Sequence, residues 1–239
     1  MKKAILFLSV FLLSVSVFSQ AGKQIFGLSA GAMFPMGDLA DNNLTDSSSG
    51  VAAAGYHIQI AYDYQLTNNF GLGVQVEFNS AKYSYNKLSK YYENIMNDTQ
   101  KQIISTQGWS LGGFFFRPYL SLPIGKKFSW EISLLGGFLG TYSPDYQYVF
   151  TSVLPPGPNK PSNYYRYRSK TFSLAYGAGT KLYIKLKKHG FFFEGRFLYS
   201  KANFKHVTGI DWQDHPYDIG IKMNLIFITA SLGYTYYLN

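Results

Sequence analysis

Residues 128–142 read FSWEISLLGGFLGTY, and an apolar residue or a glycine stands at every second position from Phe128 to Tyr142. Successive side chains of a β-strand point to opposite faces, so this period of two predicts a strand with one apolar face. The stretch is far longer than the ~5–6 residues of an average globular strand. It is long enough for the ~9–11 residues that a tilted strand needs to cross a bilayer.

The same alternation recurs along the rest of the chain, and it predicts seven further strands. Aromatic residues make up 18% of the chain and charged residues only 15%, against a usual charged fraction of about 25%. Aromatic side chains favour strands over helices. The seven stretches are residues 24–34, 56–64, 70–78, 108–124, 172–186, 191–199 and 226–238.

The connections between these strands alternate between short and long. The connections after the second, fourth and sixth strands hold a few residues, whereas the other connections are long, at residues 37–51, 84–107, 143–170 and 205–222. Short turns on one rim and long loops on the other are typical of bacterial outer-membrane barrels. An open edge inside a membrane would leave amide groups without partners, so we expect the last strand to pair with the first.

The fold class that follows is all-β: a closed, antiparallel, up-and-down transmembrane β-barrel of eight strands. A ten-stranded barrel remains the alternative if the long loops contain a hairpin. A soluble, lipocalin-like barrel is a second alternative, but its water-facing side would carry many charges. Here the less apolar face holds mostly Gly, Ser, Ala, Thr and Gln. Aromatic residues also gather at the strand ends of the apolar face, as in interfacial girdles.

The N-terminus has the pattern of a secretory leader. Lys2 and Lys3 precede an apolar run from Ala4 to Phe18, which is shorter than the ~20 residues of a membrane-spanning helix. We expect cleavage after Ser19, which leaves residues 20–239 as a single outer-membrane β-barrel domain; an N-terminal anchor is the alternative. The chain contains no cysteine, so disulfides and thiolate metal sites are excluded.

The chain is basic, with a formal net charge of +9 that falls to +7 once Lys2 and Lys3 are removed with the leader. Export argues against a nucleic-acid partner. Basic loops that face an anionic lipopolysaccharide surface are a more natural use of this charge. Simple solubility without a specific partner is the alternative.

Four short segments carry a family resemblance: residues 17–20, 27–31, 117–123 and 230–239. They resemble those of the small outer-membrane β-barrel family of the OmpA/OmpX type, and especially its Bacteroidetes branch, called PorT-like. The resemblance implies contact with outer-membrane lipid and recognition of the last strand by the barrel-assembly machinery. That strand usually ends in an aromatic residue, whereas here Leu238 and Asn239 follow Tyr237. Such families include anchors, adhesins, channels and enzymes, so the resemblance does not name an activity.

Charged residues of both signs fall on the lumen-facing phase of the predicted strands. An eight-stranded barrel is just wide enough for side chains to fill its interior, and lone buried charges there would be costly. We therefore predict that these charges pair and plug the lumen; a narrow ion path is the alternative. The residues are Asp63, Glu77, Arg117, Glu131, Lys181, Lys185, Glu194 and Arg196.

Tyrosines alternate with basic residues in the long loops, and both are frequent contact residues in interfaces. We expect this surface to bind an extracellular glycan, lipopolysaccharide or a protein. The alternative is that the upper strands extend beyond the membrane and carry these tyrosines. The binding candidates are Tyr91, Tyr92, Tyr164, Tyr165, Arg166 and Arg168.

No motif predicts catalysis, a cofactor or a metal. A lipid A-modifying enzyme would need a histidine beside a serine and a carboxylate at the outer rim. The residues that come nearest, also as metal ligands, are His206, Asp211, Asp214 and His215, without regular spacing. The predicted role is therefore structural or binding, with a small channel and, behind it, a lipid A-modifying enzyme as alternatives.

Overall fold

The computed structural model describes residues 22–43, 46–84, 101–150, 164–211 and 215–238. The predicted leader, residues 1–19, lies outside them. Within the described residues there are eleven strands and one short 3-10 helix, η1 (Gly37–Leu39). The strands are β1 (Lys23–Met36), β2 (Ala52–Gln65), β3 (Phe70–Tyr83), β4 (Lys101–Gln107), β5 (Trp109–Pro123), β6 (Phe128–Tyr142), β7 (Asp145–Phe150), β8 (Tyr164–Arg166), β9 (Lys170–Leu186), β10 (His189–Ile210) and β11 (Pro216–Leu238).

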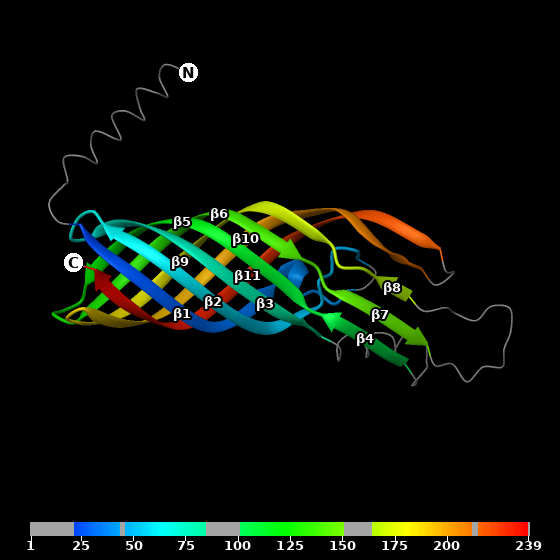
Figure 1. Cartoon of the computed structure of the whole chain (residues 1–239), viewed down its shortest axis with the longest axis horizontal. Coiled ribbons are helices and arrows are strands. Elements are labelled where there is room, and N and C mark those ends of the chain that lie inside the picture. Colours follow the sequence, from blue (N-terminus) through cyan, green and yellow to red (C-terminus); the bar gives the residue numbers. More distant parts are fainter. Residues whose placement is uncertain (1–21, 44–45, 85–100, 151–163, 212–214, 239) are drawn as a thin grey trace, which may run out of the picture.

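Eight of the strands form a closed antiparallel ring (Figure 1). The order around the ring is β11-β1-β2-β3-β5-β6-β9-β10, and β10 pairs again with β11. The first strand pairs along almost its whole length with the C-terminal part of the last, from Gln24 opposite Leu238 to Met36 opposite Ile226. The predicted eight-stranded closed barrel is confirmed. Among the described residues no helix is long and apolar enough to span a membrane.

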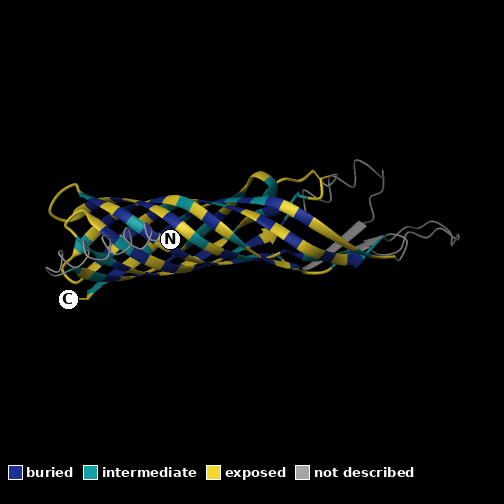
Figure 2. Cartoon of the chain, turned by 90° about the horizontal axis from the view of Figure 1, so that it is seen from above, coloured by how far each residue is buried: buried dark blue, intermediate teal, exposed yellow. Residues whose placement is uncertain are grey.

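Exposed and buried residues alternate along every strand of the ring (Figure 2). In β6, Leu134 is 63% exposed whereas its neighbour Leu135 is 4% exposed. Trp130 and Ile132 also point outward, and the charged Glu131 between them is buried. The outer face of the barrel is therefore apolar, and part of its interior is polar.

The barrel has two different ends. The turn end carries the short connections at residues 66–69, 124–127 and 187–188, and both ends of the described chain lie there (Figure 1). The loop end carries the connection at residues 37–51 and the short strands β4, β7 and β8. These strands continue the ring: β4 pairs with β7 just beyond the β5–β6 pair, and β8 joins β7 to β10. The ten-stranded alternative is wrong, because these strands lengthen the wall without widening the ring.

The predicted loop at residues 205–222 is also wrong, because β10 runs to Ile210 and β11 begins at Pro216. The period of two persists there with inverted polarity. Towards the turn end of β10, Phe193 and Phe197 are exposed. Towards the loop end, Phe204 is buried and Lys201 and Lys205 are exposed. An apolar outer face therefore changes to a polar one partway along the same strand.

The connection at residues 37–51 folds back onto the loop end. Leu39 of η1 is fully buried, and the Asp38 carboxylate accepts hydrogen bonds from the Asn224 backbone N–H at 2.8 Å and from its side-chain amide at 3.0 Å. Trp109 Nε1 donates to the Gly50 carbonyl at 2.8 Å. These bonds from β5 and β11 hold the connection against the end of the barrel.

Candidate functional site

A buried ion-pair cluster lies in the half of the lumen nearer the turn end. The Arg117 guanidinium of β5 donates to both Asp63 of β2 and Glu131 of β6. Its side chain is completely buried, and both carboxylates are nearly so. One arginine thus balances two carboxylates from strands on either side of it in the ring.

A second cluster spans the lumen. Arg196 of β10 donates from Nη1 to Glu77 Oε2 of β3 at 2.6 Å and from Nη2 to His57 Nε2 at 2.7 Å. Because the His57 Nε2 accepts, its Nδ1–H donates to Asn79 Oδ1 at 2.8 Å, and the Asn79 amide donates to Glu77 Oε1 at 2.8 Å. Glu194 adds a second carboxylate, 3.8 Å from Arg196 Nε and 3.5 Å from Lys181 Nζ. Charges from opposite walls therefore meet inside the barrel.

The structure brings together seven of the eight lumen charges singled out in the sequence. Lys185 is the exception: it lines a pocket at the turn end and forms no ion pair among the described residues. His57 and Asn79 join the clusters although they were not predicted to. The alternation held the signal for both, since His57 lies between the exposed Tyr56 and Ile58, and Asn79 follows the exposed Phe78.

A cluster of buried apolar side chains, called the apolar plug below, lies in the half of the lumen nearer the loop end. Its members come from all eight strands of the ring and from η1, and Trp109 packs edge-on against Phe204 with ring centroids 6.1 Å apart. The largest members are Met33, Leu39, Trp109, Leu111, Phe115, Leu139, Leu198, Phe204, Leu225 and Phe227. The lumen thus holds ion-pair clusters nearer the turn end and apolar side chains nearer the loop end.

A pocket of about 210 Å³ lies at the loop end, beyond the apolar plug. Its wall carries Arg166 of β8 and Tyr146 of β7: the guanidinium carbon lies 5.7 Å from the Tyr146 ring centroid, and Nη1 lies 3.4 Å from its hydroxyl. The Tyr83 ring stacks on Tyr146 at 5.4 Å. The other lining residues are Asp46, Ser47, Ser49, Val207, Tyr217, Ile219 and Ile221.

The connection at residues 37–51 contributes a negative charge to this loop-end pocket. The backbone N–H and the hydroxyl of Ser48 both donate to Asp46, at 2.8 Å each. These hydrogen bonds favour the carboxylate and lower the pKa of Asp46. The pocket lining therefore includes a carboxylate and a guanidinium, together with tyrosine and apolar side chains.

The other predicted loop residues take different positions. Tyr165 neighbours Arg166 in β8, and its hydroxyl accepts a hydrogen bond from Gln147 at 2.6 Å. Arg168 lies over the ring of Tyr142 on the outer surface, with its guanidinium carbon 4.8 Å from the centroid. Tyr164 begins β8, while Tyr91 and Tyr92 lie outside the described residues. Among the members of this set whose side chains the structure describes, Arg166 alone lines the loop-end pocket.

The histidines near the loop end form two exposed pairs. His206 Nδ1 lies 2.9 Å from Asp218 Oδ2, and His215 Nδ1 lies 3.9 Å from Asp211 Oδ2. The partner of His206 is thus Asp218, a residue that the sequence pattern had not singled out. Asp214 lies outside the described residues. In the part of the chain that the structure describes, no group of three or more His, Asp or Glu side chains could hold a metal ion.

No protein-family model matches the chain, and no curated protein matches it. Among solved structures, the chain is similar to a major outer membrane protein from Thermus thermophilus, with 12% identity over 90% of this chain and 99% of that chain and a TM-score of 0.51. It also matches OprG from Pseudomonas aeruginosa, with 11% identity over 91% of this chain and 97% of that chain and a TM-score of 0.47. A further match is Ail from Yersinia pestis, with 13% identity over 92% of this chain and 100% of that chain and a TM-score of 0.45. The chain has the fold of the small outer-membrane β-barrels.

Proposed function

We propose that this protein is an integral outer-membrane barrel, exported with removal of its leader, whose closed lumen is a scaffold and whose loop end binds an extracellular glycan. The apolar outer face supports the membrane placement, because exposed Phe and Leu side chains around the whole ring suit lipid and not water. The inversion of polarity along β10 near Tyr199 marks where the wall leaves the membrane. The loop end then faces the exterior, and the turn end faces the periplasm.

The contents of the lumen favour a scaffold over a channel. Arg117 and Arg196 are fully buried, and their partners come from several strands around the ring. An eight-stranded barrel has an interior that side chains can fill. The ion-pair clusters and the apolar plug follow each other along the barrel axis, so an ion would have to pass two barriers in series.

The observation that carries the binding role is the stacked array Tyr83, Tyr146 and Arg166 beside the loop-end pocket. Aromatic faces and a guanidinium are frequent anchors of binding energy, and tyrosine hydroxyls suit sugar hydroxyls. The volume of about 210 Å³ is below the ~300–1,000 Å³ of sites that enclose drug-sized ligands. The pocket therefore suits one ring of a larger glycan, such as the saccharide of a neighbouring lipopolysaccharide molecule.

Binding of purified lipopolysaccharide oligosaccharide to the protein in nanodiscs tests this role. We expect Arg166→Ala to weaken binding at least tenfold. Arg168→Ala is the matched control: it removes the same charge two residues away, on the outer surface, and we expect less than a twofold effect. An equal loss in both variants, or no binding by the unmodified protein, would overturn the proposal.

The proposed role is non-catalytic. Incubation of the purified protein with lipid A should leave all acyl chains in place, as mass spectrometry can show. Loss of an acyl chain that disappears in the His206→Ala variant would instead establish the lipid A-modifying alternative.

A further inference from the structure

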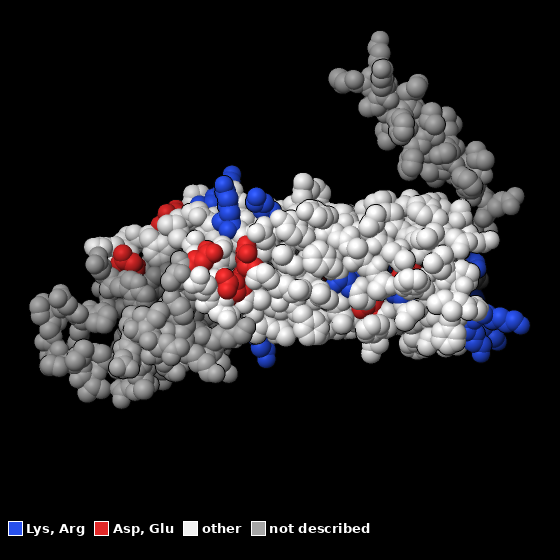
Figure 3. Space-filling model, turned by 180° about the vertical axis from the view of Figure 1, so that it is seen from behind, with Lys and Arg blue, Asp and Glu red and all other residues white. Residues whose placement is uncertain are grey.

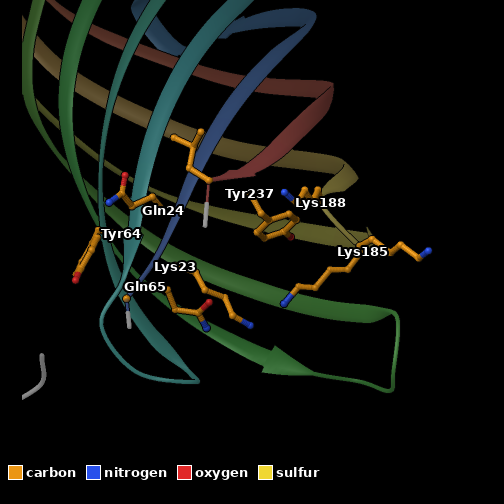
Figure 4. Close-up of a pocket in the computed structure, with 10 residues that line it drawn as sticks. Lys23, Gln24, Tyr64, Gln65, Lys185, Lys188 and Tyr237 are labelled. Carbon is orange, nitrogen blue, oxygen red and sulfur yellow. The ribbon is translucent and has the colours of Figure 1, made fainter. Parts of the chain in front are cut away.

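The turn end of the barrel opens into a second and larger pocket, of about 600 Å³ (Figure 4). Lys23 of β1 and Lys185 of β9 point into this opening from different strands. Lys187 and Lys188, which form the two-residue turn between β9 and β10, lie at its rim. The polar residues Gln24, Gln65 and Tyr237 complete the lining together with Gly22, Tyr64 and Leu238.

The charge of this turn-end pocket is one-sided. Four lysines line it, and no acidic side chain is among the described residues that do so. None of the four forms an ion pair within the described part of the chain. Figure 3 shows basic residues gathered at this end of the molecule. Like charges around one cavity repel each other, and a bound anion would remove that cost.

The backbone conformation of Lys187 is a second observation in favour of a functional role for this turn. Lys187 has a φ of 46°, in the left-handed region that favours glycine and costs other residues about 1–2 kcal/mol. Two-residue hairpin turns usually place Gly, Asn or Asp where φ is positive. A lysine here carries a conformational cost that its side chain must offset in another way.

We propose that the turn-end pocket binds a phosphate-bearing anion from the periplasmic side. Lysine ammonium groups are point charges that suit phosphate oxygens from several directions, and Lys23 and Lys185 converge on the cavity from opposite sides. Gln24, Gln65 and Tyr237 supply neutral hydrogen-bonding groups for the hydroxyls of a sugar or glycerol moiety. The phosphate belongs either to a soluble periplasmic compound or to the headgroup of an inner-leaflet lipid.

Calorimetric titration of pyrophosphate into the protein in phosphatidylcholine nanodiscs tests the site. We expect saturable binding that weakens as salt is raised, because the contacts are between full charges. The double variant Lys23→Gln with Lys185→Gln should bind at least tenfold more weakly. The control pair, Lys126→Gln with Lys127→Gln, removes two charges from the neighbouring turn at the same end and should change affinity less than twofold. No binding by the unmodified protein, or equal losses in the two pairs, would overturn the proposal.

A second set of nanodiscs identifies the source of the phosphate. If lipid headgroups occupy the pocket, phosphatidylglycerol nanodiscs should weaken pyrophosphate binding by competition. If the ligand is soluble, affinity should be the same in both lipids. The choice between these two sources rests on the proposed membrane placement. The Arg166→Ala variant, at the other end of the barrel, should bind pyrophosphate with unchanged affinity. The glycan proposal for the loop end and the phosphate proposal for the turn end can therefore fail independently of each other.

Lys187→Gly separates backbone strain from charge. We expect this variant to unfold at a higher denaturant concentration, because glycine accepts the positive φ, and yet to bind pyrophosphate several times more weakly. A variant that is more stable but binds with unchanged affinity would contradict the role given to Lys187.

Discussion

Arg196 donates a hydrogen bond to Glu77 at 2.6 Å, although 119 residues separate them in the chain. Their strands, β10 and β3, lie four places apart in a ring of eight and so face each other across the lumen. Neither side chain has any exposed surface. The contact therefore links two opposite walls of the barrel across the lumen.

Removal of this guanidinium should be strongly destabilising. Arg196→Ala leaves Glu77 and Glu194 buried with less compensation, and breaking a buried pair from one side typically costs about 3–5 kcal/mol. Urea unfolding of the protein in lipid vesicles, followed by tryptophan fluorescence, measures the change. Lys201→Ala, on the outer surface of the same strand, is the control and should cost less than about 1 kcal/mol. Similar losses in the two variants would mean that the cluster contributes no special stability.

Gly73 leaves space for the ion-pair cluster of Arg117 with Asp63 and Glu131. A Cβ atom built at Gly73 would lie 1.9 Å from Asp63 Oδ1, so Gly73→Ala should push Asp63 away from Arg117. We expect a loss of about 1–3 kcal/mol, as for other overpacked interiors. Gly136→Ala is the control, because no atom lies within 4 Å of a Cβ built there. Equal unfolding midpoints for the two variants would contradict the crowded lumen.

Much of the barrel could be predicted because its two faces meet different surroundings. In β6 the alternation of Trp130, Ile132 and Leu134 with Glu131 and Ser133 sets the strand, its phase and the inward direction of the charge. The part of β10 nearer the loop end was not predicted to be a strand, for the same physical reason. Beyond the membrane the outer face meets water, so Lys205 and His206 point outward and the segment resembles a loop. A search for inverted alternation would have found it.

The pairing of the lumen charges was less predictable than their direction. Counting residues from the turns places Glu77 level with Arg117, yet Glu77 pairs with Arg196. Barrel shear shifts the height of each strand by an amount that the sequence does not state. The array Tyr83, Tyr146 and Arg166 was hidden for a related reason, since its members come from three segments that only the extended wall brings together.

Trp109 should hold the connection at residues 37–51 in place. Trp109→Phe keeps most of the packing against Phe204 but removes the donor to the Gly50 carbonyl, at a cost of about 1–2 kcal/mol. Hydrogen–deuterium exchange should become faster at the amides of Gly50 and Val51, which are bonded within this connection. Trp130→Phe removes a similar bond, to Thr180 on the outer surface, and should leave these amides unchanged. Unaltered exchange in Trp109→Phe would show that other contacts hold the connection.

The unmodified protein should conduct no ions in a planar bilayer, because two barriers lie in series. Arg196→Ser removes side-chain volume only from the ion-pair cluster, and the double variant Phe115→Gly with Leu139→Gly removes it only from the apolar plug. Each of these variants keeps one barrier, so neither should conduct ions. The combined variant should show current steps if it folds, which its gel mobility can establish. Discrete steps from the unmodified protein would favour the channel alternative.

The central claim is that the eight-stranded ring closes within an outer membrane, with its apolar face against lipid. The most direct test is the gel mobility of protein extracted from an outer-membrane fraction, compared before and after boiling in SDS. A closed membrane barrel resists SDS until it is boiled, so the account predicts a clear heat-dependent shift. Recovery in the soluble periplasmic fraction, without any shift, would contradict it.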